Sequence, residues 1–314
     1  LDTTRIGTDA VTTVKILTAA VDTQIDHLDF LVRAWGPGER NVVVDRVKIW
    51  GDPEHDEVWH KLTALRHQTF ANACGNSLRV GMTAIDTGGA STQRVYRYCR
   101  EHRHDNVIAV KGSSQRKMPV LNKPTRKDVK NGRGELAKAG VVLWMVGTDT
   151  AKEALFARLA DWAEIPPADA ARRMVRLGKS LGPDFFRELT AEVFDTASGL
   201  WKKLRARNEA LDLMVYSHAA ACHPALRVDK LTPADWAQYE RAYEPATHDL
   251  FAAPAPVDAP DTAGHAPAGP GHSAPRAPDA APGAGAAQPL TEPTQPAAPA
   301  DEGWLGEHTA NWLD

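Results

Sequence analysis

Residues 15–50 read KILTAAVDTQIDHLDFLVRAWGPGERNVVVDRVKIW, and this stretch decides the fold. It contains three apolar runs of strand length, Lys15–Val21, Leu28–Trp35 and Val42–Trp50. The turn-forming residues 36–38 (Gly-Pro-Gly) separate the second run from the third. Apolar runs with short connections are typical of antiparallel neighbours, so the stretch predicts a meander of three antiparallel strands.

After the meander, helical and strand-like segments alternate. This order predicts an α/β fold with a mixed central sheet flanked by helices. Residues 111–133 are predicted to form a loop, because glycines and prolines interrupt them. The remaining segments are helices at His55–Ala73, Thr92–Arg100, Thr150–Trp162 and around Asp212, and strands at Leu78–Ile85, Val107–Val110 and Val141–Val146.

Composition divides the chain. Residues 251–300 hold 12 of the 22 prolines and few large apolar side chains, which predicts a disordered linker after a folded domain of residues 1–250. The formal net charge is -3, but eight acidic residues and one basic residue lie from position 251 onward. The 32 acidic and 36 basic residues before it give the predicted domain a net charge of +4. Widely spaced cysteines and the lack of a signal peptide or long apolar run favour a reducing cytoplasm. A chain that begins with Leu1 is expected to be a fragment or a processed product.

Two aspartates lie at the ends of predicted strands. Asp22 follows the first strand, and Asp86 ends a later one, directly before Gly88 and Gly89. Strands of an α/β sheet deliver such side chains to a crevice at the sheet edge. Glycines remove side-chain bulk and would let a phosphate backbone approach closely. The two aspartates are therefore candidate catalytic residues.

A third aspartate lies in residues 207–216, RNEALDLMVY, which have helical periodicity. At about 3.6 residues per turn, Asp212 shares a helix face with Val215, Tyr216 and Ala219, and this is the face that the helix should bury. A buried carboxylate without a partner is strongly destabilising. Either a cation lies near Asp212, or the helix is turned differently.

A divalent metal would explain all three aspartates. Three carboxylates about 4 Å apart would repel one another by roughly 4 kcal/mol per pair. Oxygen-only ligands favour Mg²⁺ or Mn²⁺ over zinc, and two such ions can hold the attacking and leaving oxygens of a phosphodiester. Taken singly, each aspartate is more often a helix cap or a salt-bridge partner, so the hypothesis depends on the three together.

The predicted loop at residues 111–133 is strongly basic, with Asp128 as its only acidic residue. Such a segment suits contact with a nucleic-acid backbone, and a solvated loop is an equal alternative. The candidate DNA-binding residues are Lys111, Arg116, Lys117, Lys123, Arg126 and Lys127.

Two further patterns are weaker. Cys99, His102 and His104 lie close in sequence but lack the paired spacing of a zinc site. Residues 147–152, GTDTAK, do not follow the G-x-x-x-x-G-K-[ST] order of a phosphate loop, so we expect no nucleoside-triphosphate site.

Six blocks of the sequence resemble, in order, the C-terminal nuclease half of the large terminase subunit of lambda-type tailed phages. They run from about Leu17 to Ala221 and cover roughly two-thirds of the chain. The blocks are LTAAVDTQIDHLDFLVRAWGPGE (17–39), AIDTGGASTQRVY (84–96), VIAVKG (107–112), GTDTAKEALFARL (147–159), FFRELTAE (185–192) and RNEALDLMVYSHAAA (207–221).

The resemblance implies a ribonuclease H-like nuclease fold, joined in the full protein to an upstream ATPase motor that packages DNA. It places the metal-binding aspartates of the family on Asp22, Asp86 and Asp212. In the mechanism that we predict, Asp22 bridges two ions, and Asp86 and Asp212 each complete one. Lys111 matches a lysine-glycine pair of the family, with a role near the DNA backbone or a purely structural one. The implied partners are double-stranded DNA, the ATPase domain, the small terminase subunit and the portal, in the host cytoplasm.

The chain departs from the family pattern in three places. The ATPase half is absent, and the segment between Glu192 and Lys202 is short. The linker and residues 301–314 align with nothing in the family. Trp304 and Trp312 give the end of the chain the character of a short docking motif, or they are incidental in a disordered end.

Together these features predict a metal-dependent DNA endonuclease domain that cuts concatemeric phage DNA during packaging. One alternative is a DNA-binding and portal-docking module with negligible nuclease activity of its own. Another is a ribonuclease H-like resolvase or integrase. A metal-dependent nicking assay on supercoiled plasmid, with branched DNA alongside, separates the three.

Overall fold

The computed structural model describes residues 14–71, 77–89, 91–113, 115–130, 134–161 and 174–243. The predicted linker at 251–300 and the segment with Trp304 and Trp312 lie outside these residues. Among the helices in the described ranges, none is long and apolar enough to cross a membrane.

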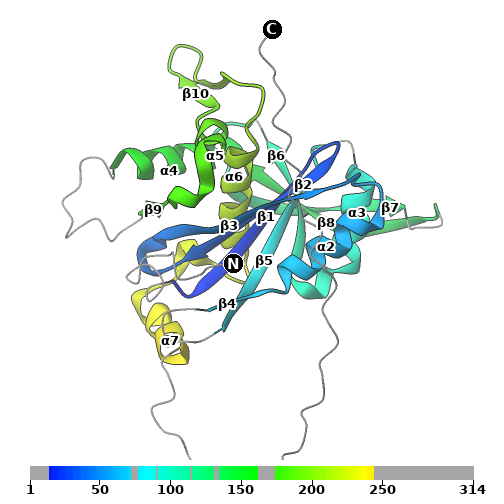
Figure 1. Ribbon diagram of the computed structural model, residues 1–314, viewed down its shortest axis with the longest axis horizontal. Helices are drawn as coiled ribbons and strands as arrows, with labels where there is room; N and C mark the ends of the chain where they lie inside the picture. The colour runs from blue at the N-terminus through cyan, green and yellow to red at the C-terminus, as the bar shows by residue number, and fades with distance from the viewer. Residues whose placement is uncertain are drawn as a thin grey trace, which may run out of the picture. The chain divides into compact units, whose positions relative to one another are not determined.

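A mixed sheet of nine strands forms the centre of the described part (Figure 1). Its strands are β1 (Ile16–Thr23), β2 (His27–Trp35), β3 (Asn41–Trp50), β4 (Thr69–Ala71), β5 (Ser77–Asp86), β6 (Val107–Ser113), β7 (Leu121–Lys130), β8 (Leu136–Gly147) and β9 (Val175–Arg176). Strands β1, β2 and β3 are antiparallel neighbours, so the predicted meander is confirmed. The pairs β1–β5, β5–β6 and β6–β8 are parallel. The order is β7-β8-β6-β5-β1-β2-β3-β9, and β4 pairs with β5.

Helices cover both faces of this sheet, as the α/β prediction requires. They are α2 (Asp56–Arg66), α3 (Thr92–Glu101), α4 (Thr148–Asp161), α5 (Gly182–Leu189), α6 (Glu209–Ala221) and α7 (Pro233–Tyr243), with 3-10 turns at Pro37–Glu39, Arg103–Asp105, Lys179–Leu181 and Val228–Lys230. Trp59 of α2 and Val95 of α3 belong to one buried cluster. Leu155, Phe185 and Leu213, from α4, α5 and α6, belong to a second. The sheet therefore separates an α2–α3 side from an α6 side. A hairpin of β10 (Glu192–Asp195) and β11 (Leu200–Lys203) links α5 to α6.

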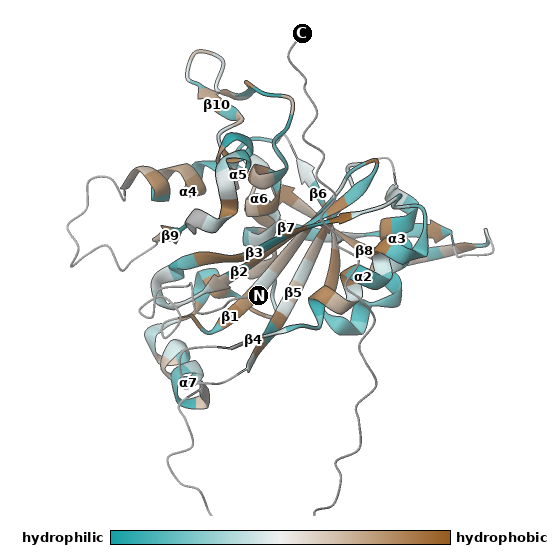
Figure 2. Ribbon diagram, viewed as in Figure 1, coloured by the Kyte–Doolittle hydropathy of each residue, from teal (hydrophilic) through white to brown (hydrophobic). Residues whose placement is uncertain are grey.

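Helix α6 lies in the core, because apolar residues are distributed around most of the helix rather than along a single face, and Figure 2 shows apolar stretches along its ribbon. It packs against β1, β2 and β5 and is contacted from outside by α4 and α5. Twelve of its thirteen residues are buried, and the exception is Asp212. The predicted face of Val215, Tyr216 and Ala219 is indeed buried. Asp212 is thus the residue of this helix that reaches a partly open surface.

The predicted loop at residues 111–133 is wrong. Strand β6 continues through Lys111 to Ser113. Strand β7 forms an antiparallel pair with β8. Strand β8 begins at Leu136, whereas the sequence predicted a strand that begins at Val141. Most of β7 is exposed, so polar residues occupy both of its faces and the apolar alternation of a strand is missing. Pro124 is tolerated there because β7 is an edge strand.

Helix boundaries differ by smaller amounts. The helix predicted over His55–Ala73 ends at Arg66, because the chain turns back to pair β4 with β5. The helix predicted over Thr150–Trp162 begins at Thr148, directly after β8 ends.

Candidate active site

The first two candidate aspartates lie side by side. Strands β1 and β5 are parallel neighbours, and Val21 pairs with Ile85. Asp22 and Asp86 are therefore the next residues on two strands whose backbones lie about 4.8 Å apart. Both side chains are nearly buried, with 6% and 9% of their surface exposed. Ala20 and Ala84, two positions earlier, belong to the core cluster on the α6 side. Since alternate residues of a strand share a face, both aspartates project toward α6.

Close packing explains the two glycines after Asp86. A Cβ atom at Gly88 would lie 3.0 Å from the Asp86 Oδ2 atom, and one at Gly89 would lie 2.7 Å from the carbonyl oxygen of Thr23. Larger residues would therefore push the loop away from the ends of β1 and β5. The glycines keep this edge of the sheet compact, and their expected role in phosphate approach stays a prediction.

The third aspartate is brought to the same edge by α6. The Thr18 hydroxyl of β1 donates a hydrogen bond of 3.0 Å to the Ser217 carbonyl, and Arg33 of β2 donates one of 3.1 Å to the Met214 carbonyl. These bonds fix the helix against the sheet. One turn after Asp212, the Tyr216 hydroxyl is hydrogen-bonded to Asp86.

Each aspartate is held by a neutral donor. The Gln24 amide donates to the Asp22 Oδ2 atom at 2.7 Å, and the Asn208 amide donates to the Asp212 Oδ2 atom at 3.0 Å. Tyr216 serves Asp86 in the same way. In the described part of the chain, none of the three aspartates forms a salt bridge. The negative charges are thus positioned but not neutralised.

The pKa values reflect this lack of neutralisation. Burial, followed by the charges of Asp86 and Asp212, raises the pKa of Asp22 from 3.8 to about 8. Burial also raises the pKa of Asp212 to about 7, although the Lys152 ammonium group opposes the change. The pKa of Asp86 is raised by burial and partly restored by its hydrogen bonds and by Lys111. The three carboxylates therefore sense one another electrostatically.

The donor chemistry of this edge fits a hard divalent cation. The carboxylates offer oxygen ligands, and the Asp86 Oδ1 atom is buried without a hydrogen-bond partner. Among the described residues, however, no three Asp, Glu, His or Cys side chains are already gathered closely enough to hold a metal ion. The aspartates share an edge and a face, and mutual repulsion opposes their closer approach.

A polar network next to Asp212 was not predicted from the sequence. Lys152 of α4 donates a hydrogen bond of 2.6 Å to the Glu192 Oε2 atom of β10, and Asn208 joins Glu192 to Asp212. Lys203 of β11 donates to the Asn208 side chain. Only Asn208 carried a sequence signal, because it precedes Asp212 by four residues and so shares its helix face.

The candidate DNA-binding residues do not form one group. By strand alternation Lys111 projects to the face opposite Asp86, since its neighbour Val110 pairs with Asp86. Arg116 and Lys117 lie in the turn before β7, and a Cβ atom at Gly199 would meet the Arg116 guanidinium at 2.6 Å. Arg116 thus packs over the β10–β11 turn.

The other three basic residues are exposed on β7: Lys123, Arg126 and Lys127. Arg126 pairs with Val142 and Lys127 with Val141, so these two project to opposite faces of the sheet.

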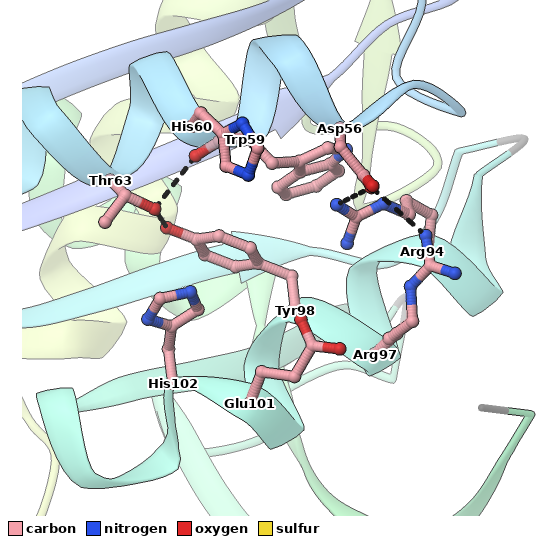
Figure 3. Close-up of a pocket in the computed structure, with 9 residues that line it drawn as sticks. All are labelled: Asp56, Trp59, His60, Thr63, Arg94, Arg97, Tyr98, Glu101 and His102. Carbon is pink, nitrogen blue, oxygen red and sulfur yellow. Dashed lines mark hydrogen bonds and ion pairs between the residues drawn. The ribbon is translucent and has the colours of Figure 1, made fainter. Parts of the chain in front are cut away.

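A separate cavity of about 310 Å³ lies between α2 and α3, on the other side of the sheet (Figure 3). Asp56 bridges Arg94 and Arg97 there, at 2.7 and 3.5 Å. Glu101 and His102 also line it. The two acidic and two basic side chains balance, so the cavity indicates no ligand of a definite charge.

Taken together, the meander, the parallel strands that end in aspartates and the aspartate on a packed helix define a mixed α/β protein with an acidic site at one edge of its central sheet. Residues 6–236 match the family model of the terminase large subunit gpA, endonuclease domain. The chain belongs to this family.

Two phage proteins are similar to the chain. The large terminase subunit of Enterobacteria phage P21 is 33% identical over 219 residues, and that of Escherichia phage lambda is 32% identical over 219 residues. Each alignment covers 66% of this chain and 32% of the relative, so the match spans about a third of each relative. No solved structure matches the chain.

Proposed function

We propose that this chain is a metal-dependent endodeoxyribonuclease that hydrolyses phosphodiester bonds of double-stranded DNA during phage DNA packaging. The observation that carries the proposal is the set of three aspartates on one edge of the sheet, each held by a neutral donor and none by a cation. A protein that stored these charges for stability alone would pair them with arginine or lysine.

Asp22, Asp86 and Asp212 would hold two Mg²⁺ or Mn²⁺ ions. When bound, such ions supply Lewis-acid activation of water and of the phosphate. The protein contributes orientation. Hydrogen bonds from Gln24 and Tyr216 orient the Asp22 and Asp86 carboxylates. The hydrogen bonds between α6 and the sheet set the position of Asp212 relative to these two residues.

Contacts to the DNA backbone would come from the candidate basic residues of β6, β7 and the turn between them. Arg126 projects from β7 to the face that carries the aspartates, and Arg116 lies over the β10–β11 turn. Lys111 follows Val110, which pairs with Asp86, but the Lys111 side chain projects to the other face of the sheet. Lys123 precedes Pro124, which the register through Trp144 and Val110 places level with Asp86. Lys117, Lys123 and Lys127 would add electrostatic attraction for the DNA backbone.

The similarity to large terminase subunits supports a proposal about the partners of this chain. Because the chain matches about a third of each large terminase subunit, we propose that it acts with an ATPase domain, a small terminase subunit and the portal, on concatemeric DNA in the host cytoplasm. We also propose that residues 301–314, with Trp304 and Trp312, form a docking motif.

The test is nicking of supercoiled plasmid by the purified chain with Mg²⁺ or Mn²⁺, beside samples in a metal chelator and with Asp22→Asn. We expect metal-dependent nicking that the substitution abolishes. DNA binding without nicking would indicate a docking module, and preference for branched DNA would indicate a resolvase. Activity that survives both Asp22→Asn and the chelator would overturn the proposal.

A further inference from the structure

Asn208 occupies the position that normally caps a helix. It is the N-cap residue of α6, yet its side chain makes no capping hydrogen bond. Asparagine at this position usually accepts a hydrogen bond from the backbone N–H two or three residues later, and that bond stabilises the helix. The side chain must therefore serve something other than the end of the helix.

The amide group instead contacts three charged side chains. Its Nδ2 atom donates to the Glu192 Oε1 atom at 2.9 Å and to the Asp212 Oδ2 atom at 3.0 Å. Its Oδ1 atom accepts a hydrogen bond of 2.8 Å from the Lys203 ammonium group. All polar atoms of this side chain have partners of the matching kind.

These partners also settle which way the amide is turned. A flipped amide would place its oxygen against two carboxylates and its NH₂ group against an ammonium group, and all three hydrogen bonds would be lost. The two negative and one positive neighbours therefore permit a single orientation. A neutral side chain with two donors can join two carboxylates without neutralising either of them.

A buried ion pair anchors the far end of this arrangement. Lys152 and Glu192 are joined at 2.6 Å, and each side chain is only 9% exposed. Lys152 belongs to α4 and Glu192 to β10. The hydrogen bond from Asn208 to Glu192 therefore connects Asn208 to elements outside its own helix. The position of the Asp212 Oδ2 atom is thereby tied to three elements of the fold.

We propose that Asn208 is a positioning residue that orients the Asp212 carboxylate for metal binding, with Glu192 and Lys203 holding its amide in place. This inference rests on the proposed nuclease function. Residues that orient a ligand through hydrogen bonds typically change metal affinity or activity by about 10- to 100-fold when they are substituted. A residue that merely began the helix would change stability alone.

The experiment compares Asn208→Ser with the parent protein in the full chain. Serine keeps the capping preference of the position but is too short to join Glu192 to Asp212. We expect Mn²⁺ affinity measured by calorimetry to fall about tenfold or more, and kcat for nicking to fall similarly at fixed metal. KM for DNA and the melting temperature without metal should change little, and excess Mn²⁺ should restore much of kcat.

Three further variants make the result decisive. Asn208→Asp keeps the shape and the Lys203 contact but replaces both donors with an acceptor, so it should also lose Mn²⁺ affinity. Lys203→Met should cause a smaller loss in the same direction. Lys202→Met is the matched control, because Lys202 lies on the same hairpin but pairs with Asp195 at 2.5 Å. It should resemble the parent.

Asp212→Asn in the same assays separates the two proposals. If the parent binds metal and nicks DNA, Asp212→Asn does neither and both Asn208 variants behave like the parent, this inference fails while the nuclease proposal stands. If the parent neither binds metal nor nicks, both fail. A loss of melting temperature in Asn208→Ser with unchanged metal affinity would assign Asn208 to helix stability and overturn the inference.

Discussion

Two charged sites on opposite sides of the central sheet differ in how their side chains are paired. On the α2–α3 side, Asp56 bridges Arg94 and Arg97, so each of these side chains has a partner of opposite charge. On the α6 side, Asp22 and Asp86 are nearly buried and Asp212 is half-buried, and all three receive hydrogen bonds from neutral groups. A charge that the fold compensates indicates a structural contact, whereas a positioned and uncompensated charge indicates a ligand. The comparison can be tested on both sides.

The largest expected effect comes from Asp212→Asn. If the carboxylate exists to hold metal, this change removes nicking to the background level. It also removes a carboxylate whose pKa burial has raised to about 7, so the metal-free protein should be equally stable or more stable by about 1 kcal/mol. Plasmid nicking and thermal unfolding in chelator measure the two effects. Unfolding of the metal-free variant would show that Asp212 is structural.

Binding of a metal ion at the three aspartates should raise the thermal stability of the parent protein. At about 100 times its dissociation constant, Mg²⁺ or Mn²⁺ bound to the folded state adds roughly 2.7 kcal/mol. For a domain of this size that raises the melting temperature by about 5–10 °C. Asp212→Asn should show little of this increase, and Asp56→Asn should show all of it. Equal increases in both variants would place the metal elsewhere.

Asp56→Ala should affect stability rather than nicking, which is the reverse of the effect expected for Asp212→Asn. It deprives Arg94, whose side chain is 5% exposed, of its carboxylate partner. We expect a loss of about 1–2 kcal/mol of stability, equal with and without metal, and unchanged nicking. Glu57→Ala is the matched control, since Glu57 is an exposed acid in the same first turn and pairs with Lys61. Denaturant unfolding should show little change for Glu57→Ala, and a nicking defect in Asp56→Ala would contradict the comparison.

Elements could be predicted from the sequence where the local pattern of apolar residues matches their burial in the structure. The meander could be predicted because each of its strands is apolar and the connections are short. Asp22 and Asp86 could be found because they end apolar strands, and Asp212 because it interrupts an apolar helix. Each signal lies within about ten residues of chain.

The missed features depend on contacts between distant segments. Strand β7 has no apolar alternation, because most of its surface lies beyond the cover of the helices, so its pairing with β8 was not visible. Lys152 and Glu192 are 40 residues apart, and nothing in either segment marks them as a pair. The neutral donors of the site were missed for the same reason, since Gln24 and Tyr216 are ordinary residues until the fold places them.

The smallest expected effect distinguishes the two faces of a single strand. Arg126 and Lys127 are consecutive and both exposed, but Lys127 pairs with Val141, which belongs to the core on the α2–α3 side. Arg126 therefore shares a face with the aspartates. Arg126→Ala should weaken binding to double-stranded DNA a few-fold and reduce the slope of log K against log salt by about 0.9, the value for one lost phosphate contact. Lys127→Ala should change both quantities less, because its charge lies on the opposite face. Fluorescence anisotropy at several salt concentrations, in chelator to prevent cleavage, measures both variants. Equal losses would mean that DNA contacts the edge of β7 without distinguishing its faces, and the difference between the two sides of the sheet would then end at the aspartates.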